Sequence, residues 1–427
     1  MGFFFLNLIV VFVLLKKKGM LFHINKKFIF SILIIFLINY NQVYSNNSEH
    51  IKTPKIKKKI INKTLWKKGE GIYNNYRIPS LIVTKKGTLL AFAEGREAGD
   101  TGDIDVLLKI SYDNGLSWSD EKIILDDAYN TIGNPTPVVD VQSGRIWLFT
   151  TWNNGKDNES QIINKTSLSP RKPYSCYSDD DGITWSKPVD MSTNLGDDSW
   201  GWYATGPGIG IQIKNGKYKD RLLIPANHSY DDTKGKIRGG PFSYGSHVIY
   251  SDDYGKSWKK SSSIRPGCNE SQIVELNNGY LMMNMRSYNN KYSRAISISS
   301  DGGQTWSEIH HDYQLVESRC QASVLNYGNH NGNKLHIFSN PSVPIGRTNM
   351  TIKISFDDCK SWNVSKQIYS GFSAYSCLTK LPNGNIGLLF EMGGGKDDNN
   401  SKDLRYNKMV FLSIPIEVIF SDNEIKL

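Results

Sequence analysis

The chain has 427 residues and a formal net charge of +10, but five lysines in residues 1–45 and eight in residues 46–68, against the single acid Glu49, supply more than all of this excess. Residues 69–427 carry 38 basic and 40 acidic groups, so the main part of the chain has no basic surplus and we predict no nucleic-acid partner. The five cysteines are scattered without a C-x-x-C pair, which argues against a zinc site and against a small disulfide-stapled fold.

The first segment has the composition of a targeting sequence. Residues 1–45 contain two apolar runs, 3–15 and 28–38, which lysines separate, and neither reaches the roughly 18 residues of a membrane span. A start at Met20 gives the order of a signal peptide: a basic start, a short apolar core and a cleavage site at the end of the segment. We predict a secreted, periplasmic or cell-surface protein without a stable membrane span after signal removal; the alternative is an uncleaved amphipathic anchor. Residues 46–68 are predicted to be a lysine-rich, solvated linker.

The most regular feature of the remaining sequence is an eight-residue motif, Ser-x-Asp-x-Gly-x-(Ser/Thr)-Trp. Apolar residues recur at alternate positions before the serines, which predicts β-strands that run into turns. Aspartate favours a turn because its carboxylate accepts bonds from nearby backbone N–H groups, and glycine because it tolerates a positive φ. We interpret the motifs as structural hairpins, each closed by a tryptophan ring packed on the sheet. The copies begin at Ser111, Ser178, Ser251, Ser299 and Ser355, and the fifth has Cys359 in place of the glycine.

From Gly69 onward, short β-rich runs alternate with clusters of Gly, Asn, Asp and Pro, and we find no amphipathic helix of three turns. This pattern predicts an all-β fold. The repeated hairpins predict a β-propeller, and six blades would hold about 60 residues each, enough for four strands and their loops. The motifs begin 67, 73, 48 and 56 residues apart, so we expect loops of unequal length and one blade without a motif. Residues 69–427 are predicted to form this single domain.

Segments between the hairpin motifs resemble those of a known family. They are Tyr76-Arg77-Ile78-Pro79 ahead of the first motif, Asn269-Glu270-Ser271-Gln272, and Ala374-Tyr375-Ser376 near the end. Together with the five motifs, over about residues 70–420, the chain resembles the sialidases (neuraminidases) of the bacterial and animal Asp-box type. The resemblance implies a six-bladed β-propeller with Asp-box hairpins that releases terminal sialic acids from glycoproteins, glycolipids or oligosaccharides.

Sialic acid carries a carboxylate on its anomeric carbon, and arginine binds such a group through two parallel N–H donors. The family uses three arginines from different blades for this purpose. The resemblance places them at Arg77, Arg286 and Arg347. Because three clustered guanidinium groups repel one another, one of them needs an anionic partner, and Glu391 matches the glutamate that holds the first arginine in the family.

The charge of the substrate also bears on the nucleophile. A carboxylate would be repelled by an anomeric carbon that bears another carboxylate, whereas a phenol is neutral until it attacks, and sialidases use a tyrosine. Tyr375 matches that position in the family. A phenol has a pKa near about 10 and needs a base beside it. Glu270 matches the family glutamate that shares this proton.

The departing glycosidic oxygen needs a proton donor, and we expect an acid whose pKa is kept high by partial burial. The family carries this aspartate on a mobile loop ahead of the first hairpin motif. Asp100 fits the family spacing best, Asp103 is its competitor, and Asp105 lies in the same loop. Arg96, also in this loop, resembles the family arginine that contacts the hydroxyl face of the sugar. Residues 200–208 resemble the family's loop under the sugar ring.

The residues and the resemblance together predict a retaining exo-α-sialidase that works through a covalent tyrosyl intermediate. The predicted catalytic residues are Asp100, Glu270 and Tyr375, and the predicted substrate-binding residues are Arg77, Arg96, Arg286, Arg347 and Glu391. The predicted partners are sialylated glycans. No metal and no cofactor are predicted, since we find neither a metalloprotease-type histidine pair nor a Walker-type glycine loop.

Two alternatives remain at this point. A trans-sialidase would use the same residues to transfer sialic acid to a sugar acceptor, but the 52 residues after Tyr375 are too few for the lectin domain that such enzymes commonly append. A non-catalytic propeller that binds glycans would keep the hairpins but would not need the catalytic residues and the three arginines. These six residues are Arg77, Asp100, Glu270, Arg286, Arg347 and Tyr375. The sequence predicts no oligomeric state.

Overall fold

The computed structural model describes residues 59–393, 405–422, 424, 425 and 427. The predicted leader (1–45) and residues 46–58 of the predicted linker lie outside the described residues. The described residues belong to a compact unit that begins at Lys58.

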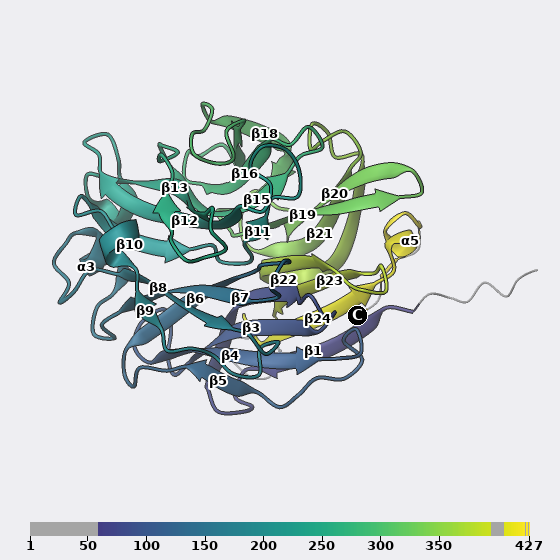
Figure 1. The fold of residues 1–427 in the computed structure, drawn as a ribbon, viewed down its shortest axis with the longest axis horizontal. Coiled ribbons are helices and arrows are strands. Elements are labelled where there is room, and N and C mark those ends of the chain that lie inside the picture. Colours follow the sequence, from purple (N-terminus) through teal and green to yellow (C-terminus); the bar gives the residue numbers. More distant parts are fainter. Residues whose placement is uncertain (1–58, 394–404, 423, 426) are drawn as a thin grey trace, which may run out of the picture. The chain divides into compact units, whose positions relative to one another are not determined.

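Strands make up nearly all of the regular structure in this unit, as Figure 1 shows, and the predicted all-β class is confirmed. The helices of the described residues are one turn or little more in length: α3 (Glu159–Ile163), α4 (Ser192–Leu195), the 3-10 helix η1 (Ile237–Gly239) and α5 (Ile416–Ile419). None of these described helices is long and apolar enough to span a bilayer.

The first sheet contains eight strands and consists of two antiparallel groups. β4 and β6 join the groups by a parallel pairing at one position, Ile104 with Thr131. The first group comprises β2 (Asn75–Val83), β3 (Leu89–Arg96), β4 (Ile104–Ser111) and β5 (Lys122–Leu125). The second group comprises β6 (Thr131–Val139), β7 (Ile146–Asn153), β8 (Lys172–Ser178) and β9 (Val189–Asp190).

Two smaller antiparallel sheets follow in the chain. One holds β10 (Trp200–Thr205), β11 (Ile211–Gln212), β12 (Leu222–Asp231), β13 (Phe242–Ser251) and β14 (Lys259–Lys260). The other holds β15 (Cys268–Glu275), β16 (Leu281–Ser287), β17 (Ser293–Ser299) and β18 (His310–Val316). Successive groups pack face to face through apolar side chains: Phe149 of β7 and Ile224 of β12, both fully buried, share one core cluster.

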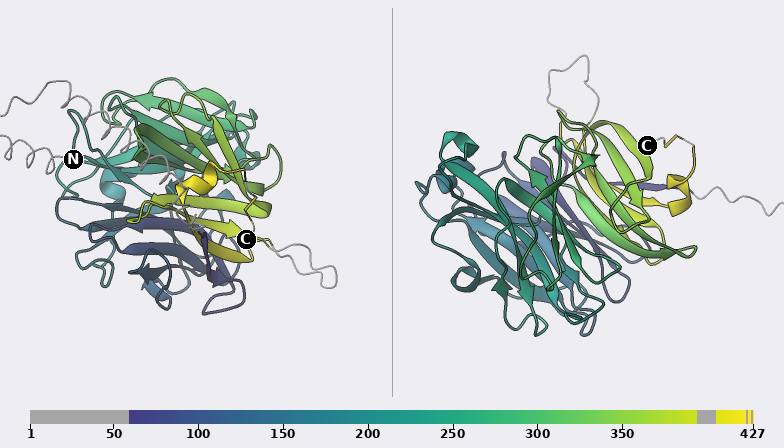
Figure 2. Two further views of the ribbon diagram at one scale, coloured as in Figure 1. Left: turned by 90° about the vertical axis from the view of Figure 1, so that its right-hand side faces the viewer. Right: turned by 90° about the horizontal axis from the view of Figure 1, so that it is seen from above.

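The last sheet has seven strands and includes the first strand of the described chain. β22 (Val364–Lys380) joins two antiparallel groups, because its first half pairs with β21 and its second half with β23. The other strands are β19 (Ser323–His330), β20 (Asn333–Pro341), β21 (Thr348–Ser355), β23 (Ile386–Met392), β24 (Lys408–Ile414) and β1 (Ile61–Lys67). The succession of sheets in chain order can be followed by colour in Figure 1 and from two other sides in Figure 2.

Strand β1 corrects the predicted linker. It falls within residues 46–68, yet it pairs antiparallel with β24 along its length. Leu65 and Trp66 are buried, with 5% and 3% of their surface exposed, and they join the core between β24 and the first sheet. The exposed face of the strand carries Lys63, and such polar residues are why the composition indicated a solvated segment. The linker prediction therefore applies only to the part of this segment that precedes β1.

The five hairpin motifs form the same hydrogen-bonded turn. In each, the serine hydroxyl donates to the aspartate carboxylate over 2.8 or 2.9 Å and accepts from the backbone N–H at the glycine position. Cys359 adopts a φ of 63° and so keeps the turn of the fifth copy. The tryptophan rings pack across to another group of strands and not on their own hairpin alone: Trp118 contacts Phe411 of β24, and Trp258 contacts Phe149 of β7.

Candidate active site

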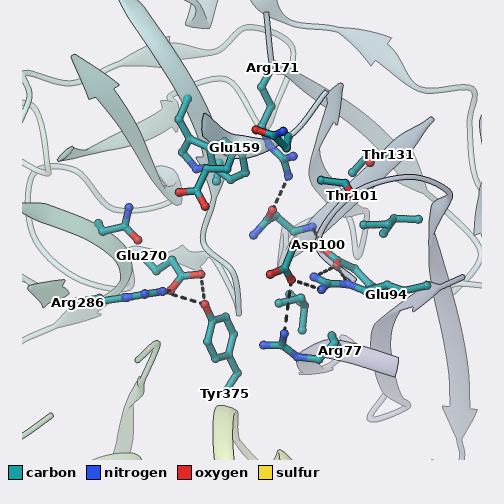
Figure 3. A pocket seen from close by; sticks show the side chains of 18 of the residues that line it. Arg77, Glu94, Asp100, Thr101, Thr131, Glu159, Arg171, Glu270, Arg286 and Tyr375 are labelled. Atoms are coloured by element: carbon teal, nitrogen blue, oxygen red, sulfur yellow. Dashed lines mark hydrogen bonds and ion pairs between the residues drawn. The ribbon is translucent and has the colours of Figure 1, made fainter. Parts of the chain in front are cut away.

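One cavity of about 550 Å³ collects the polar side chains that the sequence singled out, and Figure 3 shows how they face one another. Seven of the eight predicted site residues line it: Arg77, Arg96, Asp100, Glu270, Arg286, Arg347 and Tyr375. The eighth, Glu391, contacts Arg77 and is fully buried. The fold therefore brings together residues that lie up to 314 positions apart in the sequence.

Arg77 in β2 is held by Glu391 in β23. Its Nε donates to Oε1 of the carboxylate over 2.7 Å and its Nη2 to Oε2 over 3.3 Å. The same carboxylate accepts from the backbone N–H groups of Ile78, over 2.9 Å, and of Tyr375, over 3.1 Å. Burial opposes the charge of the guanidinium and is the largest single influence, but Glu391, Tyr406 and Tyr375 together outweigh it and raise the pKa of Arg77. Glu391 thus has the place predicted for it and also fixes the backbone of the predicted nucleophile.

The predicted nucleophile and its predicted base are in direct contact. The Tyr375 hydroxyl donates to Oε1 of Glu270 over 2.5 Å. Nη1 of Arg286 donates to Oε2 of Glu270 over 2.7 Å and to the Tyr375 oxygen over 3.0 Å. Burial, and then the charge of Glu270, raise the pKa of Tyr375 well above its ordinary value, whereas Arg286 and Arg347 act in the opposite direction. The phenol is therefore neutral at rest, with an acceptor for its proton at hydrogen-bond distance.

Five strands carry a β-bulge at the cavity, where two residues oppose one residue of the partner strand. The bulged pairs are 78–79 in β2, 134–135 in β6, 201–202 in β10, 269–270 in β15 and 374–375 in β22. Each pair contributes at least one residue to the cavity wall, because the extra residue turns a side chain away from the regular alternation of the strand. Ile78 takes a φ of 61°, rare for a β-branched residue, and its N–H bond to Glu391 holds it there.

Arg347 completes the group of three arginines without a carboxylate partner among the described residues. Its Nη1 donates to the Tyr406 hydroxyl over 2.8 Å and its Nη2 to the backbone carbonyl of Arg319 over 3.4 Å. Arg286 likewise donates from Nη2 to the Tyr288 hydroxyl over 2.7 Å. Two of the three arginines therefore donate hydrogen bonds to phenol oxygens.

Asp100 lies at the open side of the cavity, and 83% of its side chain is exposed. Its Oδ1 accepts from Nη1 of Arg96 over 2.5 Å and lies 3.7 Å from Nη1 of Arg77. Desolvation raises the pKa of Asp100, but the charges of Arg96 and then of Arg77 outweigh it, and the net direction is downward. This corrects the expectation of an acid whose pKa is kept high by partial burial.

The two other aspartates of the loop lie outside the cavity wall. Neither Asp103 nor Asp105 is among the described residues that line it. Asp105 is buried and accepts a hydrogen bond from the Tyr73 hydroxyl, and burial is the main cause that raises its pKa to about 7. The placement favours Asp100 over Asp103 as the proton donor, and the role itself stays a prediction.

Several cavity residues have no counterpart among the sequence predictions. Glu94 accepts from Nε of Arg96 over 2.7 Å. Arg171, only 7% exposed, donates to Asn134 over 2.8 Å, and its guanidinium lies 4.2 Å from the ring centre of Trp202. Burial lowers the pKa of Arg171 to about 10. Trp202 belongs to a segment that the resemblance had marked, whereas only the contacts of the folded chain reveal Arg171.

A phenol bonded to a carboxylate and surrounded by three arginines is an arrangement that could bind an anion and supply a nucleophile. Comparisons with known proteins define the family of this chain. A BNR repeat-like domain matches residues 87–388. An exo-alpha-sialidase of Aspergillus fumigatus is 32% identical over 361 residues, which cover 78% of this chain and 82% of the fungal protein. A sialidase of Bacteroides fragilis is 33% identical over 344 residues, which cover 74% of this chain and 60% of the bacterial protein. The chain belongs to the sialidase family.

A solved structure supports the same relationship. The structure of Hadza microbial sialidase Hz136 is similar with a TM-score of 0.69 at 29% sequence identity, covering 81% of this chain and 66% of that chain. Sialidases are β-propellers, and the predicted propeller is confirmed. The number of six blades stays a prediction, which the division of the two large sheets at β4/β6 and within β22 supports. This chain spans 60% of the length of the Bacteroides protein.

Proposed function

We propose that this protein is an exo-α-sialidase that hydrolyses terminal sialic acids of glycoproteins, glycolipids or oligosaccharides with retention of configuration. The observation that carries the proposal is the 2.5 Å hydrogen bond from the Tyr375 hydroxyl to Glu270, with Arg286 in contact with both. A neutral nucleophile with its base beside it suits an anomeric carbon that bears a carboxylate. Membership in the sialidase family supports the same activity.

The substrate carboxylate would bind to Arg77, Arg286 and Arg347, which come from β2, from β16 and from the residue that precedes β21. Glu391 pairs with the first of these arginines and Glu270 with the second. The five groups together keep one net positive charge. The site therefore attracts a monoanion, and the planar guanidinium groups favour a carboxylate.

The reaction would proceed in two displacements. Tyr375 forms a bond from its oxygen to the anomeric carbon while its proton passes to Glu270, and Asp100 donates a proton to the glycosidic oxygen as the bond to the aglycone breaks. A water molecule then attacks the same carbon and gives a proton to Asp100. The phenolate of Tyr375 leaves and regains its proton from Glu270, which restores all three residues.

Asp100 has to be protonated before it can act as the acid, although Arg96 and Arg77 hold its pKa below the ordinary value. A substrate carboxylate bound to Arg77 would bring a negative charge close to Asp100. That charge offsets part of the effect of the arginines and raises the pKa of Asp100. Binding of the anionic sugar would thus prepare the acid for the first displacement.

A fluorogenic sialoside tests the proposal, with product stereochemistry followed by proton NMR. The wild type should release the α-anomer first, and Tyr375→Phe should lose at least about 10³-fold in kcat/KM. Tyr369→Phe is the matched control, because that phenol bonds the backbone carbonyl of Gly393 outside the cavity. An inert wild type, or initial release of the β-anomer, contradicts the proposal. Addition of lactose as an acceptor distinguishes sialyl transfer from hydrolysis.

We also propose that residues 1–45 direct export and are removed. The basic start, the short apolar core and the site after Ser45 support this. N-terminal sequencing of protein recovered from the medium or periplasm tests it, with a mature start at residue 46 as the expected result. Recovery of chains that retain the leader would contradict cleavage.

A further inference from the structure

Tyr406 contacts two of the three arginines at once. It lies just before β24, and its ring centre is 3.9 Å from the guanidinium carbon of Arg77. Phe372 packs edge-on against the ring, with 4.9 Å between the ring centres and 80° between the planes, and so supports the stack. The backbone of Tyr406 has a φ of 56°, a left-handed conformation that is uncommon in residues other than glycine.

The phenol of Tyr406 still has a proton to donate. Its oxygen accepts from Nη1 of Arg347 over 2.8 Å. No acceptor for its own O–H occurs among the residues that the structure describes, and Tyr406 lines the same cavity as Tyr375. A phenol carries one donor and can accept as well, so the remaining donor is available to a ligand in the cavity.

The charges around the arginines explain why a phenol suits this position. Arg77 is paired with Glu391 and Arg286 with Glu270, whereas Arg347 has no carboxylate partner in the described part of the chain. A carboxylate in place of Tyr406 would cancel the positive charge that a substrate anion needs. A phenol fixes the guanidinium of Arg347 and leaves its charge intact.

We propose that Tyr406 is a fourth donor to the substrate carboxylate and the residue that positions Arg77 and Arg347 around it. This inference rests on the proposed sialidase function and adds a substrate-binding residue to it. The hydroxyl of Tyr406 donates to a carboxylate oxygen, and its ring stacks on the guanidinium of Arg77 and supports it. Two separable contributions follow, one from the hydroxyl and one from the ring.

Tyr406→Phe removes the hydroxyl and keeps the ring. The variant should bind the carboxylate inhibitor 2-deoxy-2,3-didehydro-N-acetylneuraminic acid about tenfold more weakly by calorimetry, because it loses a hydrogen bond to a charged group. Its KM on a fluorogenic sialoside should rise by a similar factor, while kcat stays within about threefold, since the bond is made in the ground state and in the transition state alike. Tyr369→Phe, which removes a phenol outside the cavity, should change neither constant.

Tyr406→Leu removes the ring as well and tests the positioning role. It should lose affinity further and lower kcat by about tenfold or more, because Arg77 then keeps its bonds to Glu391 but loses the ring that stacks on its face. Inhibitor affinity of Tyr406→Phe within twofold of the wild type would overturn the assignment of the donor, and equal constants for the Phe and Leu variants would overturn the role of the ring. If the wild type neither binds the inhibitor nor turns over the sialoside, the proposed function is wrong. If the wild type does both and only the variants behave differently from expectation, the role of Tyr406 alone is wrong.

Discussion

Asp100 is exposed to solvent on one side and faces two positive charges on the other. Arg96 bonds its carboxylate directly, and Arg77 lies 3.7 Å away. Glu94 bonds the opposite edge of Arg96 and keeps that guanidinium in place. Desolvation raises the pKa of Asp100, but the positive charges together set the net downward direction, so the protonation of the proposed acid depends on which of these charges a ligand offsets.

Arg96→Gln tests this dependence. Loss of one adjacent positive charge raises the pKa of Asp100, so a larger fraction of the carboxyl is protonated at any given pH. The descending alkaline limb of kcat/KM against pH should move to higher pH by about one unit. The absolute rate should fall too, because Arg96 lines the cavity. The quantity to compare is therefore the pH at which the alkaline limb descends, and not the rate itself. Arg145→Gln, which removes a surface arginine paired with Asp179, should leave the limb where it is; an unshifted limb in Arg96→Gln would contradict the argument.

Leaving-group dependence distinguishes Asp100 from Asp103. Asp100→Ala should lower kcat on a natural sialyl linkage by about 10²- to 10⁴-fold, because a sugar alcohol leaves slowly without a proton donor. On a substrate with an acidic phenol leaving group the loss should be below about tenfold. Asp103→Ala should show no such difference, since its side chain is outside the cavity wall. If Asp103→Ala alone shows it, the assignment of the acid is wrong.

At the scale of single residues, the sequence identified those that a motif marks. Arg77, Glu270 and Tyr375 stand in recognisable segments, and the structure brings them to one cavity. Tyr406 and Arg171 stand in no motif, and their importance lies in contacts with residues far away in the chain. Such contacts depend on strand pairing and packing, which no local pattern encodes.

The repeated structural device at the site is the β-bulge. In β15 and β22 the single residues opposite the bulges are Arg286 and Glu391, so each bulge faces a predicted site residue on its partner strand. Pro79 and Pro135 lie within two of the five bulges, where a residue without an N–H is tolerated. Proline within a strand is a local sign of a bulge, but it does not locate the arrangement, because a bulge is defined by the register between two strands and the sequence of one strand does not specify it.

The glycine positions of the hairpin motifs allow a test of how closely neighbouring groups of strands pack. A Cβ on Gly255 would lie 2.2 Å from ring atoms of Trp147, and Gly255 has a φ of 90°. Gly255→Ala should therefore destabilise the protein by about 2–4 kcal/mol through overpacking and backbone strain. Cys359→Gly should change stability by less than about 1 kcal/mol, because relief of a φ of 63° is offset by loss of a partly buried side chain. Urea unfolding measures both, and equal losses would contradict the packing argument.

On the scale of the whole molecule, the two ends of the described unit meet in one sheet. β1 and β24 pair although they are separated by nearly the whole chain. Alternation and turn residues were enough to predict an all-β chain, and the repeats were enough to predict a propeller. The closing strand was missed because its exposed face carries lysine and asparagine, and only the partner strand explains why Leu65 and Trp66 are apolar.

Truncation measures what this closure contributes. A chain that begins at residue 59 keeps β1 and should match the full chain in unfolding midpoint and in sialidase activity. A chain that begins at residue 69 loses β1, which removes buried Leu65 and Trp66 from the core and leaves the edge of β24 unpaired. Loss of a buried tryptophan side chain alone costs about 3–5 kcal/mol, so the shorter chain should unfold at much lower urea concentration or aggregate.

Trp66→Ala in the chain that begins at residue 59 tests the same contribution without depending on the solubility of the truncated protein. If both the truncation and Trp66→Ala leave the unfolding midpoint unchanged, β1 is not part of the stable fold and the segment is the linker that its lysines indicated.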